Sequence, residues 1–219
     1  MIRFEQIEIK YGDFVAIRDL NLHIKEGEFF TFLGPSGCGK TTSLRTLVGF
    51  ITPSKGKIKI ADKEVTHLPV EKREIGMVFQ SYALFPTMSV YDNIAFGLRV
   101  QKLSKDEIDK KVRAVAAKIK ITDEQLKKNV AALSGGQQQR VSIGRALMNA
   151  PAVMLADEPT GSLDSHNGHE IIKLLKLSQK RYRQTLIIVT HDESIALQAD
   201  RIIGISDGRV VRDERVVRS

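Results

Sequence analysis

One stretch of the chain combines glycines, a lysine and a threonine in an order that suits phosphate groups. Residues 34–41 read Gly-Pro-Ser-Gly-Cys-Gly-Lys-Thr, fit the pattern G-x-x-x-x-G-K-[ST] and follow the apolar run 29–33. Glycines let successive backbone N–H groups curve around an anion, and the helix expected over 42–48 adds partial positive charge at its start. We expect Lys40 to reach the β and γ phosphates of a nucleotide, and the Thr41 hydroxyl to bind Mg²⁺. The predicted nucleotide-binding residues are Gly34, Pro35, Ser36, Gly37, Cys38, Gly39, Lys40, Thr41 and Thr42.

Two acidic residues, Asp157 and Glu158, end the apolar run 153–156. An aspartate at the carboxyl end of a strand, beside a phosphate-binding loop, can hold Mg²⁺. Successive strand residues point to opposite sides, so the two acids can have different roles. We assign Asp157 to the metal and Glu158 to orienting or deprotonating an attacking water. The alternative is a charged turn that closes a strand.

A second helix start in the chain carries glycines. Residues 133–137 read Leu-Ser-Gly-Gly-Gln, and Ser134 with Gln137 forms the sequence pattern of a capping box. Gly135 and Gly136 weaken the first turn of a helix, so they are easier to explain if backbone N–H groups approach an anion there. We therefore predict a second phosphate-binding helix start at Ser134, Gly135, Gly136 and Gln137.

The composition fits one globular domain. The chain has 219 residues, 34 Lys and Arg against 26 Asp and Glu, and a net charge of +8. A basic surface favours acidic partners, such as a nucleotide, a nucleic acid or an anionic membrane face. The single cysteine excludes an internal disulfide, no run of about 18 apolar residues suggests a membrane span, and the first residues do not resemble a signal peptide. We expect a soluble intracellular protein.

The hydrophobic pattern predicts an α/β fold. The apolar residues of 4–9, followed by Leu20, Leu22 and Ile24 at period two, indicate a half-buried antiparallel layer, whereas 29–33, 75–79, 153–156 and 186–189 are short continuous apolar runs. Such runs, separated by helical segments, predict a mostly parallel sheet. Residues 89–150 read as consecutive helices. We expect a single domain over 1–219, in which 1–88 and 151–219 form the core with its antiparallel β layer and 89–150 form an inserted helical subdomain.

Half of the excess positive charge lies within the inserted segment. Residues 102–128 hold nine Lys and Arg against five Asp and Glu, with no aromatic residue among them. A nucleic-acid groove would interleave aromatic side chains with the charges. We read this segment as a solvated helical face and expect no nucleic-acid partner.

The order of these motifs resembles that of the ABC transporter ATPases. The phosphate-binding loop is followed by Gln80 after a strand, by Leu-Ser-Gly-Gly-Gln, by Asp157-Glu158, by residues 162–164 (Ser-Leu-Asp) and by His191 after a further strand. The likeness runs from Tyr11 to about residue 207. It implies a P-loop ATPase core that binds ATP with Mg²⁺ and hydrolyses ATP, and a second ATPase subunit, with each ATP held between the loop of one copy and the Ser134 helix of the other in a head-to-tail homodimer.

The resemblance also implies roles for four further residues. Gln80 would touch Mg²⁺ and the attacking water, His191 would contact the γ phosphate, Asp164 would cross the dimer interface, and Tyr11 would stack on adenine. Each has a structural alternative: a polar strand end for Gln80, a strand cap for His191, a helix cap for Asp164, and an aromatic lid on the core for Tyr11.

The resemblance implies membrane partners as well. Integral membrane permease subunits would carry the solute and, for an importer, a solute-binding protein would deliver it, with this chain peripheral at the cytoplasmic face of the membrane. Residues 81–88 are polar-poor, and we weigh an exposed docking loop against buried loop packing. Residues 78–99 resemble polyamine, ferric-iron or phosphonate importers, whereas 156–165 resemble lipoprotein-release and macrolide-efflux ATPases. We favour import and keep two alternatives: an exporter-type ATPase, and a non-transport ATPase that regulates a membrane complex or acts on DNA.

Overall fold

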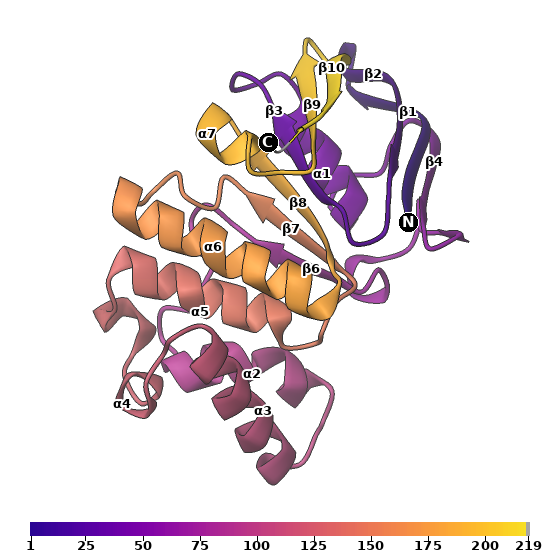
Figure 1. Cartoon of the computed structure of the whole chain (residues 1–219). Coiled ribbons are helices and arrows are strands. Elements are labelled where there is room, and N and C mark those ends of the chain that lie inside the picture. Colours follow the sequence, from indigo (N-terminus) through magenta and orange to yellow (C-terminus); the bar gives the residue numbers. More distant parts are fainter. Residues whose placement is uncertain (218–219) are drawn as a thin grey trace.

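A six-stranded sheet forms the centre of the computed structural model, which describes residues 1–217 (Figure 1). Its strands run in the order β10-β9-β3-β8-β7-β6, and all pairs are parallel except β9 with β10. The bounds are β3 Phe29–Leu33, β6 Ile75–Val78, β7 Val153–Asp157, β8 Thr185–Thr190, β9 Arg201–Ser206 and β10 Arg209–Arg215. Strands β7 and β8 are buried along their whole length, which explains their continuous apolar runs. The predicted mostly parallel α/β sheet is confirmed.

A separate antiparallel sheet covers one side of the molecule, in the order β2-β1-β4-β5 (Figure 1). Its strands are β1 Ile2–Tyr11, β2 Phe14–Ile24, β4 Lys55–Ile60 and β5 Lys63–Glu64. Phe4 and Ile7 are both buried although they lie three residues apart, because the register shifts between them and Gln6 has a φ of 52°. In a regular strand Phe4 and Ile7 would point to opposite faces of the sheet, and this bulge lets both face the same core. The predicted antiparallel layer is confirmed, and the alternation that predicted it is interrupted here.

Helices cover both faces of the central sheet. They are α1 Lys40–Val48, α2 Val90–Val100, α3 Lys105–Lys118, α4 Asp123–Leu126, α5 Gly135–Leu147, α6 Ser165–Tyr182 and α7 Glu193–Ala196, with 3-10 turns η1 Val70–Lys72 and η2 Val130–Ala132. Helix α1 lies between the two sheets, and its Leu44 and Leu47 belong to the core that joins them (Figure 1). The opposite face of the sheet packs on α5 and α6, so that apolar side chains fill both sides. Within residues 1–217, no helix is both long and apolar enough to cross a lipid bilayer.

The guanidinium group of Arg73 fixes the carboxyl end of α1. Arg73 is 5% exposed and donates hydrogen bonds to the carbonyl oxygens of Thr46, Leu47, Thr66 and Leu68. The last carbonyls of a helix have no partner inside the helix, so a cation there satisfies them and complements the helix dipole. Burial lowers the pKa of Arg73 from its ordinary value. Arg73 therefore ties the chain before β6 to the helix that begins at Lys40.

The helices of segment 89–150 begin with capping motifs. Ser104 with Glu107, Thr122 with Gln125, and Ser134 with Gln137 each form a reciprocal capping box.

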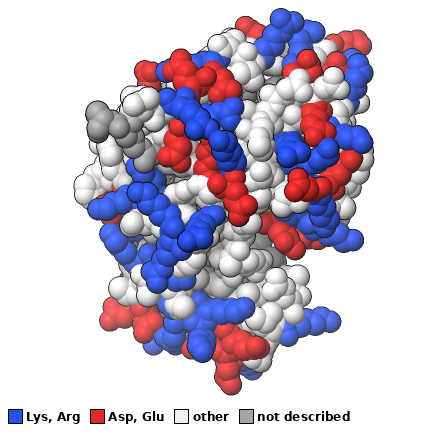
Figure 2. Space-filling model, turned by 45° about the vertical axis from the view of Figure 1, so that its right-hand side comes forward, with Lys and Arg blue, Asp and Glu red and all other residues white. Residues whose placement is uncertain are grey.

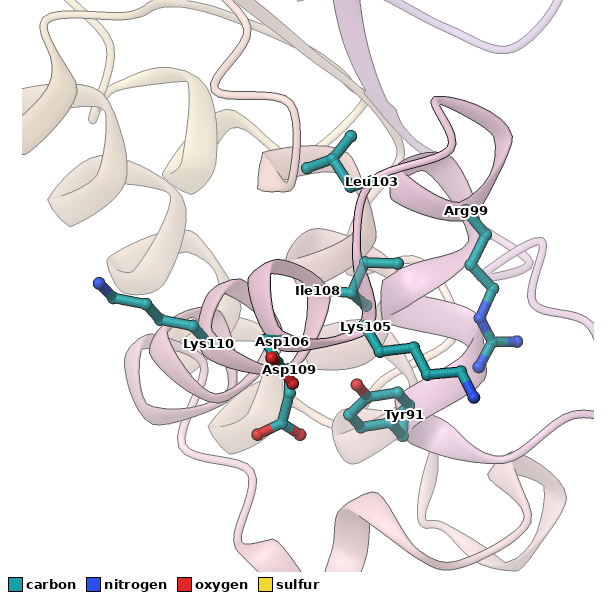
Figure 3. A pocket seen from close by; sticks show the side chains of 8 residues that line it. All are labelled: Tyr91, Arg99, Leu103, Lys105, Asp106, Ile108, Asp109 and Lys110. Atoms are coloured by element: carbon teal, nitrogen blue, oxygen red, sulfur yellow. The ribbon is translucent and has the colours of Figure 1, made fainter.

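Figure 3 shows the groove between α2 and α3, a hollow of about 810 Å³. Tyr91 lines this groove, and burial, followed by the charge and hydrogen bond of Asp109, raises the pKa of the tyrosine. Asp109 also bonds to Arg113, so the acid in this groove has a basic partner.

Charged side chains of both signs are mixed on the face that Figure 2 presents. On the antiparallel sheet, Glu5 pairs with Lys59 at 2.9 Å, and Glu8 pairs with Lys10 and Lys55. These pairs, of which Glu5–Lys59 and Glu8–Lys55 join β1 to β4, hold the pKa values of Glu5 and Glu8 below their ordinary range against the opposing effect of desolvation. Exposed pairs contribute little free energy, but they favour the observed strand register.

The loop 81–88 packs part of its apolar side chains against the protein. Leu84, Phe85 and Met88 are half-buried, and Leu84 contacts the core that includes α2 and α5. The ring of Phe85 lies 4.6 Å from that of Phe96. The loop thus combines partly packed apolar side chains with exposed positions, and its role as a docking loop stays a prediction. The exposed apolar residues nearby are instead Val70, Phe96 and Val100, which line a groove of about 790 Å³.

Candidate active site

The loop between β3 and α1 forms one wall of a polar pocket of about 290 Å³. Gly39 has a φ of 109°, which favours glycine, whereas the nearest atom to an added Cβ is the movable Cδ1 of Ile17 at 2.5 Å, so conformation is the stronger reason for glycine here. A Cβ atom at Gly34 would lie 2.4 Å from the carbonyl oxygen of Ile205. The pocket brings together Ser36, Gly37, Gly39, Lys40, Thr41, Thr42, Arg45, Gln80, Asp157 and Glu158.

Lys40 is buried in this loop and bonded to its backbone. Its Nζ atom lies 2.7 Å from the carbonyl oxygen of Gly34 and 2.6 Å from that of Pro35. The ammonium group is therefore held by neutral acceptors, which a phosphate anion would outcompete because it adds the attraction between opposite charges. Cys38 is 7% exposed and belongs to the core between the sheets, so its backbone, not its thiol, is left to face an anion.

Thr41 and Asp157 meet at the bottom of the pocket. The Thr41 hydroxyl lies 3.0 Å from Oδ1 of Asp157. Burial raises the pKa of Asp157, and the neighbouring charge of Glu158 raises it further, against the lowering effect of the Thr41 hydrogen bond. A buried carboxylate beside a second acid is a site where a cation is stabilised. Hydroxyl, carboxylate and the side-chain amide oxygen of Gln80 are all hard oxygen donors, as Mg²⁺ prefers.

Protein ligands alone do not complete a metal site. In the part of the chain that the structure describes, no group of three or more His, Cys, Asp or Glu side chains could hold a metal ion. Protein-bound Mg²⁺ commonly takes one or two protein ligands and completes its shell with water and phosphate oxygens. The residues present therefore fit a Mg²⁺ ion that binds together with a nucleotide.

Glu158 and His191 follow neighbouring parallel strands and meet at their carboxyl ends. Nδ1 of His191 lies 3.0 Å from Oε1 of Glu158. Glu158 has a φ of 47°, a conformation that non-glycine residues rarely adopt, and its N–H donates to the carbonyl oxygen of Val189 in β8. Strained backbone of this kind is concentrated at functional sites. The Glu158 side chain is 17% exposed, whereas His191 is 64% exposed and accessible to a ligand.

Gln80 lies between this pocket and the loop that follows Glu158. It lines the pocket, and its Nε2 atom sits where a Cβ atom added at Gly161 would be only 2.7 Å away. The Gln80 side chain therefore packs on the backbone of the loop that contains Gly161, which is more than the alternative of a polar strand end would require.

The predicted second phosphate site lies apart from the pocket at Lys40. Ser134 caps α5, with its Oγ accepting from the Gln137 N–H at 3.4 Å, and none of the residues 134–137 lines the pocket. A Cβ atom at Gly135 would lie 2.7 Å from the hydroxyl of Tyr82, and one at Gly136 would lie 2.7 Å from Oδ1 of Asn167. Close packing within one chain is thus a reason for these glycines that sequence analysis did not find. Anion binding across an interface stays a prediction.

Two more predicted residues lie outside the pocket. Tyr11 is 50% exposed near the turn between β1 and β2, which does not suit the alternative of a lid on the core. Asp164 caps α6, with Oδ1 accepting from the Asn167 N–H at 2.9 Å, and its hydrogen bonds to Asn167 lower the pKa of the carboxyl. The helix-cap alternative for Asp164 is therefore realised, and its crossing of an interface stays a prediction.

Two polar residues near the site were not predicted from the sequence. Arg45 lines the pocket, and its spacing of four residues from Thr41 on α1 could have indicated this. Gln139 is fully buried beside the loops of Gln80 and Glu158. Gln139 lies four residues before Ile143 and so shares the buried face of α5, which could have indicated a polar residue at a core position.

Comparisons with known proteins agree with this architecture. The family model described as ABC transporter matches residues 17–161. The spermidine/putrescine import ATP-binding protein PotA of Bacteroides fragilis is 48% identical over 201 residues, which cover 91% of this chain and 43% of that protein. The protein of the same name from Rubrobacter xylanophilus is 45% identical, with 95% of this chain and 55% of the relative covered. The chain spans about half the length of these curated relatives.

Solved structures match along almost the whole chain. A dimeric structure of the ATP-binding cassette MJ0796, in a post-hydrolysis state with ADP and Pi, is 34% identical, with a TM-score of 0.89 and full coverage of both chains. CbiO1 from Clostridium perfringens, part of the ABC transporter complex cbiONQ, is 35% identical, with a TM-score of 0.90 and coverage of 98% of this chain and 88% of that chain. The chain has the fold of these cassettes and belongs to the ABC transporter family.

Proposed function

We propose that the chain binds ATP with Mg²⁺ and hydrolyses its β–γ bond to drive transport across a membrane. The observation that carries this proposal is one pocket that unites Lys40, Thr41, Asp157 and Glu158, with His191 bonded to Glu158. The cassette MJ0796, which has the same fold, was solved with ADP and Pi.

Each side chain of the pocket has a role in this reaction. Lys40 exchanges the carbonyl oxygens of Gly34 and Pro35 for the β and γ phosphates. When bound, Mg²⁺ neutralises charge on the phosphate oxygens, and Thr41, Asp157 and Gln80 would hold it. Glu158 orients the attacking water and accepts its proton.

His191 has two contacts in the proposed mechanism. Its Nδ1 side fixes the carboxylate of Glu158, and its exposure leaves the other ring nitrogen free for the γ phosphate. Little covalent chemistry falls to the protein, because positioning and charge stabilisation supply most of the catalysis of phosphoryl transfer.

We propose that two copies of the chain act as a homodimer with ATP between them. In this arrangement residues 134–137 and Asp164 of one copy complete the pocket at Lys40 of the other, and Tyr11 stacks on adenine. The separation of Ser134 from the pocket within one chain, and the dimeric states of the MJ0796 cassette, support this arrangement. ATP then favours the closed dimer, and hydrolysis removes the contacts that hold it.

We further propose that the chain serves a polyamine importer at the cytoplasmic face of a membrane. Integral membrane permease subunits and a solute-binding protein would be its partners in import, and the PotA relatives are named as spermidine/putrescine import ATP-binding proteins. Segment 89–150 acts as a helical subdomain beside the core formed by 1–88 and 151–219. The groove lined by Val70, Phe96 and Val100 offers apolar contacts to a permease. Flux of spermidine through vesicles that contain the chain with its co-purified permease would test the solute, and flux of ferric iron without spermidine flux would refute it.

The ATPase proposal is tested with Glu158→Gln. This variant is expected to bind ATP and Mg²⁺ as the wild type does, to lose turnover by about 10²- to 10⁴-fold, and to elute as a stable dimer in size-exclusion chromatography with ATP. Glu193→Gln, which changes an exposed acid outside the pocket, is the matched control and should behave as the wild type. A Glu158→Gln protein that hydrolyses ATP normally and stays monomeric would refute the role of Glu158.

A further inference from the structure

A buried amide joins three segments around the proposed active site. Gln139 lies on α5 with none of its surface exposed. Its Nε2 atom donates to the carbonyl oxygen of Pro159 at 2.6 Å and to that of Phe79 at 3.3 Å. Phe79 directly precedes Gln80, and Pro159 directly follows Glu158. One side chain therefore holds the backbone next to both residues that are proposed to act on the attacking water.

The helix that carries Gln139 is the one that begins at Ser134. The capping box of Ser134 and Gln137 fixes the first turn of α5, so Gln139 stands in its second turn. The Tyr82 hydroxyl packs against Gly135, and the Gln80 amide packs against Gly161. The start of α5 and the loops after β6 and β7 thus contact one another through close, polar packing, with Gln139 bonded to both loops.

The burial of Gln139 makes these hydrogen bonds hard to replace. Its Oε1 atom is buried and has no hydrogen-bond partner among the described residues. Buried polar atoms are nearly always paired, and a buried amide with a free oxygen is tolerated where its geometry is needed. An apolar side chain of similar volume at this position would avoid that cost but would leave both loops without their common donor.

We propose that Gln139 is a positioning residue for ATP hydrolysis, which fixes the loops of Gln80 and Glu158 to the helix start at Ser134. This inference rests on the proposed function, and it adds a coupling between sites. Because Ser134 would serve the partner's ATP while Glu158 serves the chain's own, Gln139 links the two sites of the dimer. Gln139 does not line the pocket, so ATP affinity does not depend on it directly.

A matched pair of substitutions tests this role. Gln139→Leu removes both donors at similar volume. Gln184→Leu is the control, because Gln184 is 2% exposed, donates to the carbonyl oxygen of Pro151 at 2.6 Å, accepts from Ser178, and lies outside the pocket. Both variants should lose stability in urea unfolding. Only Gln139→Leu should also lower kcat, by about 10- to 100-fold, because misplaced catalytic groups are costly.

Two readouts separate positioning from folding. Gln139→Leu should bind a non-hydrolysable ATP analogue as the wild type does, and the dependence of its rate on ATP should lose cooperativity, with a Hill coefficient near that of independent sites. Should Gln139→Leu fail to fold, Gln139→Asn, which keeps an amide but has a shorter reach, should show the same fall in kcat.

Equal kinetics for Gln139→Leu and Gln184→Leu, after correction for the folded fraction, would overturn the inference. The same conclusion follows if Gln139→Asn is needed and retains the kcat and cooperativity of the wild type. Failure of the wild type itself to hydrolyse ATP would instead refute the proposed function, so the two failures are distinguishable.

Discussion

Nδ1 of His191 lies 3.0 Å from Oε1 of Glu158, and the two residues directly follow the adjacent parallel strands β8 and β7. Parallel order brings the carboxyl ends of β7 and β8 to one edge, so side chains 33 residues apart meet without a long loop. The contact uses one ring nitrogen and one carboxylate oxygen, and within residues 1–217 no hydrogen bond is recorded for the second atom of either group. The pair can therefore orient water and phosphate together.

This contact predicts non-additive effects on turnover. His191→Ala is expected to lower the rate of phosphate release by about 10²-fold, and to lower it little further in a Glu158→Gln protein, because both changes disable the same step. His169→Ala is the control, since His169 is exposed and bonds only to the Ser165 carbonyl oxygen among the described contacts. Fully additive losses would contradict a shared role.

The raised pKa of Asp157 predicts a stability difference that depends on pH. The folded state holds the Asp157 proton more tightly than the unfolded state, because burial disfavours the charge. The stability this proton contributes is present at low pH and is lost as the pH rises from the unfolded value of about 3.9 through the raised folded value. In the absence of Mg²⁺ and nucleotide, Asp157→Asn should therefore gain stability relative to the wild type as the pH rises through this range.

Urea unfolding of both proteins across that pH range measures the difference. Subtracting one curve from the other removes the titration of other carboxyl groups. Mg²⁺ with an ATP analogue should reverse the sign, because only the wild type binds the metal through a carboxylate. A difference that stays constant with pH would contradict the assigned burial effect.

The sequence predicted well the features that depend on local pattern. The glycines around Lys40, the capping box at Ser134 and the buried runs of β7 and β8 are each encoded within a few residues, and each occurs where expected. The pairing of β1 with β4, and the strands β9 and β10, were not predicted, because they depend on long-range hydrogen bonds that leave no local period.

Residues that act through tertiary contacts were not predicted from the sequence, for a related reason. Arg73 and Gln139 are polar residues whose partners are backbone carbonyls from other segments. Carbonyls carry no sequence signal, so neither residue could be assigned a partner before the fold was known. The glycines 135 and 136 were interpreted through anion binding alone because the packing of Tyr82 and Asn167 on them is equally invisible in the sequence.

The position of Arg73 predicts a large loss of stability on substitution. Arg73→Met leaves the carbonyls of Thr46, Leu47 and Thr66 without their donor and should lower the free energy of unfolding by about 3 kcal/mol. Arg73→Lys should recover only part of this, since a lysine lacks the planar fork of donors. Arg18→Met, at an exposed position, should change stability by less than about 0.5 kcal/mol. An Arg73→Met protein as stable as the Arg18→Met control would contradict this structural role.

Gly135 has two possible reasons to be glycine, and a double-mutant cycle separates them. A Cβ atom there would lie 2.7 Å from the Tyr82 hydroxyl but 3.7 Å from Cζ of that ring, so the hydroxyl is the obstacle. Gly135→Ala alone should be neutral or destabilising. In a Tyr82→Phe protein the same change should stabilise by about 0.5–1 kcal/mol, because alanine is the better helix former.

Turnover then reports on the second reason. If the Gly135 N–H approaches the partner's phosphates, the double variant Tyr82→Phe, Gly135→Ala should be stable and yet hydrolyse ATP more slowly than the wild type. The single variant Tyr82→Phe should hydrolyse ATP at a rate close to that of the wild type. Recovery of full activity along with stability would mean that packing against Tyr82 is the whole reason for this glycine, and the proposed anion contact at Gly135 would have to be abandoned.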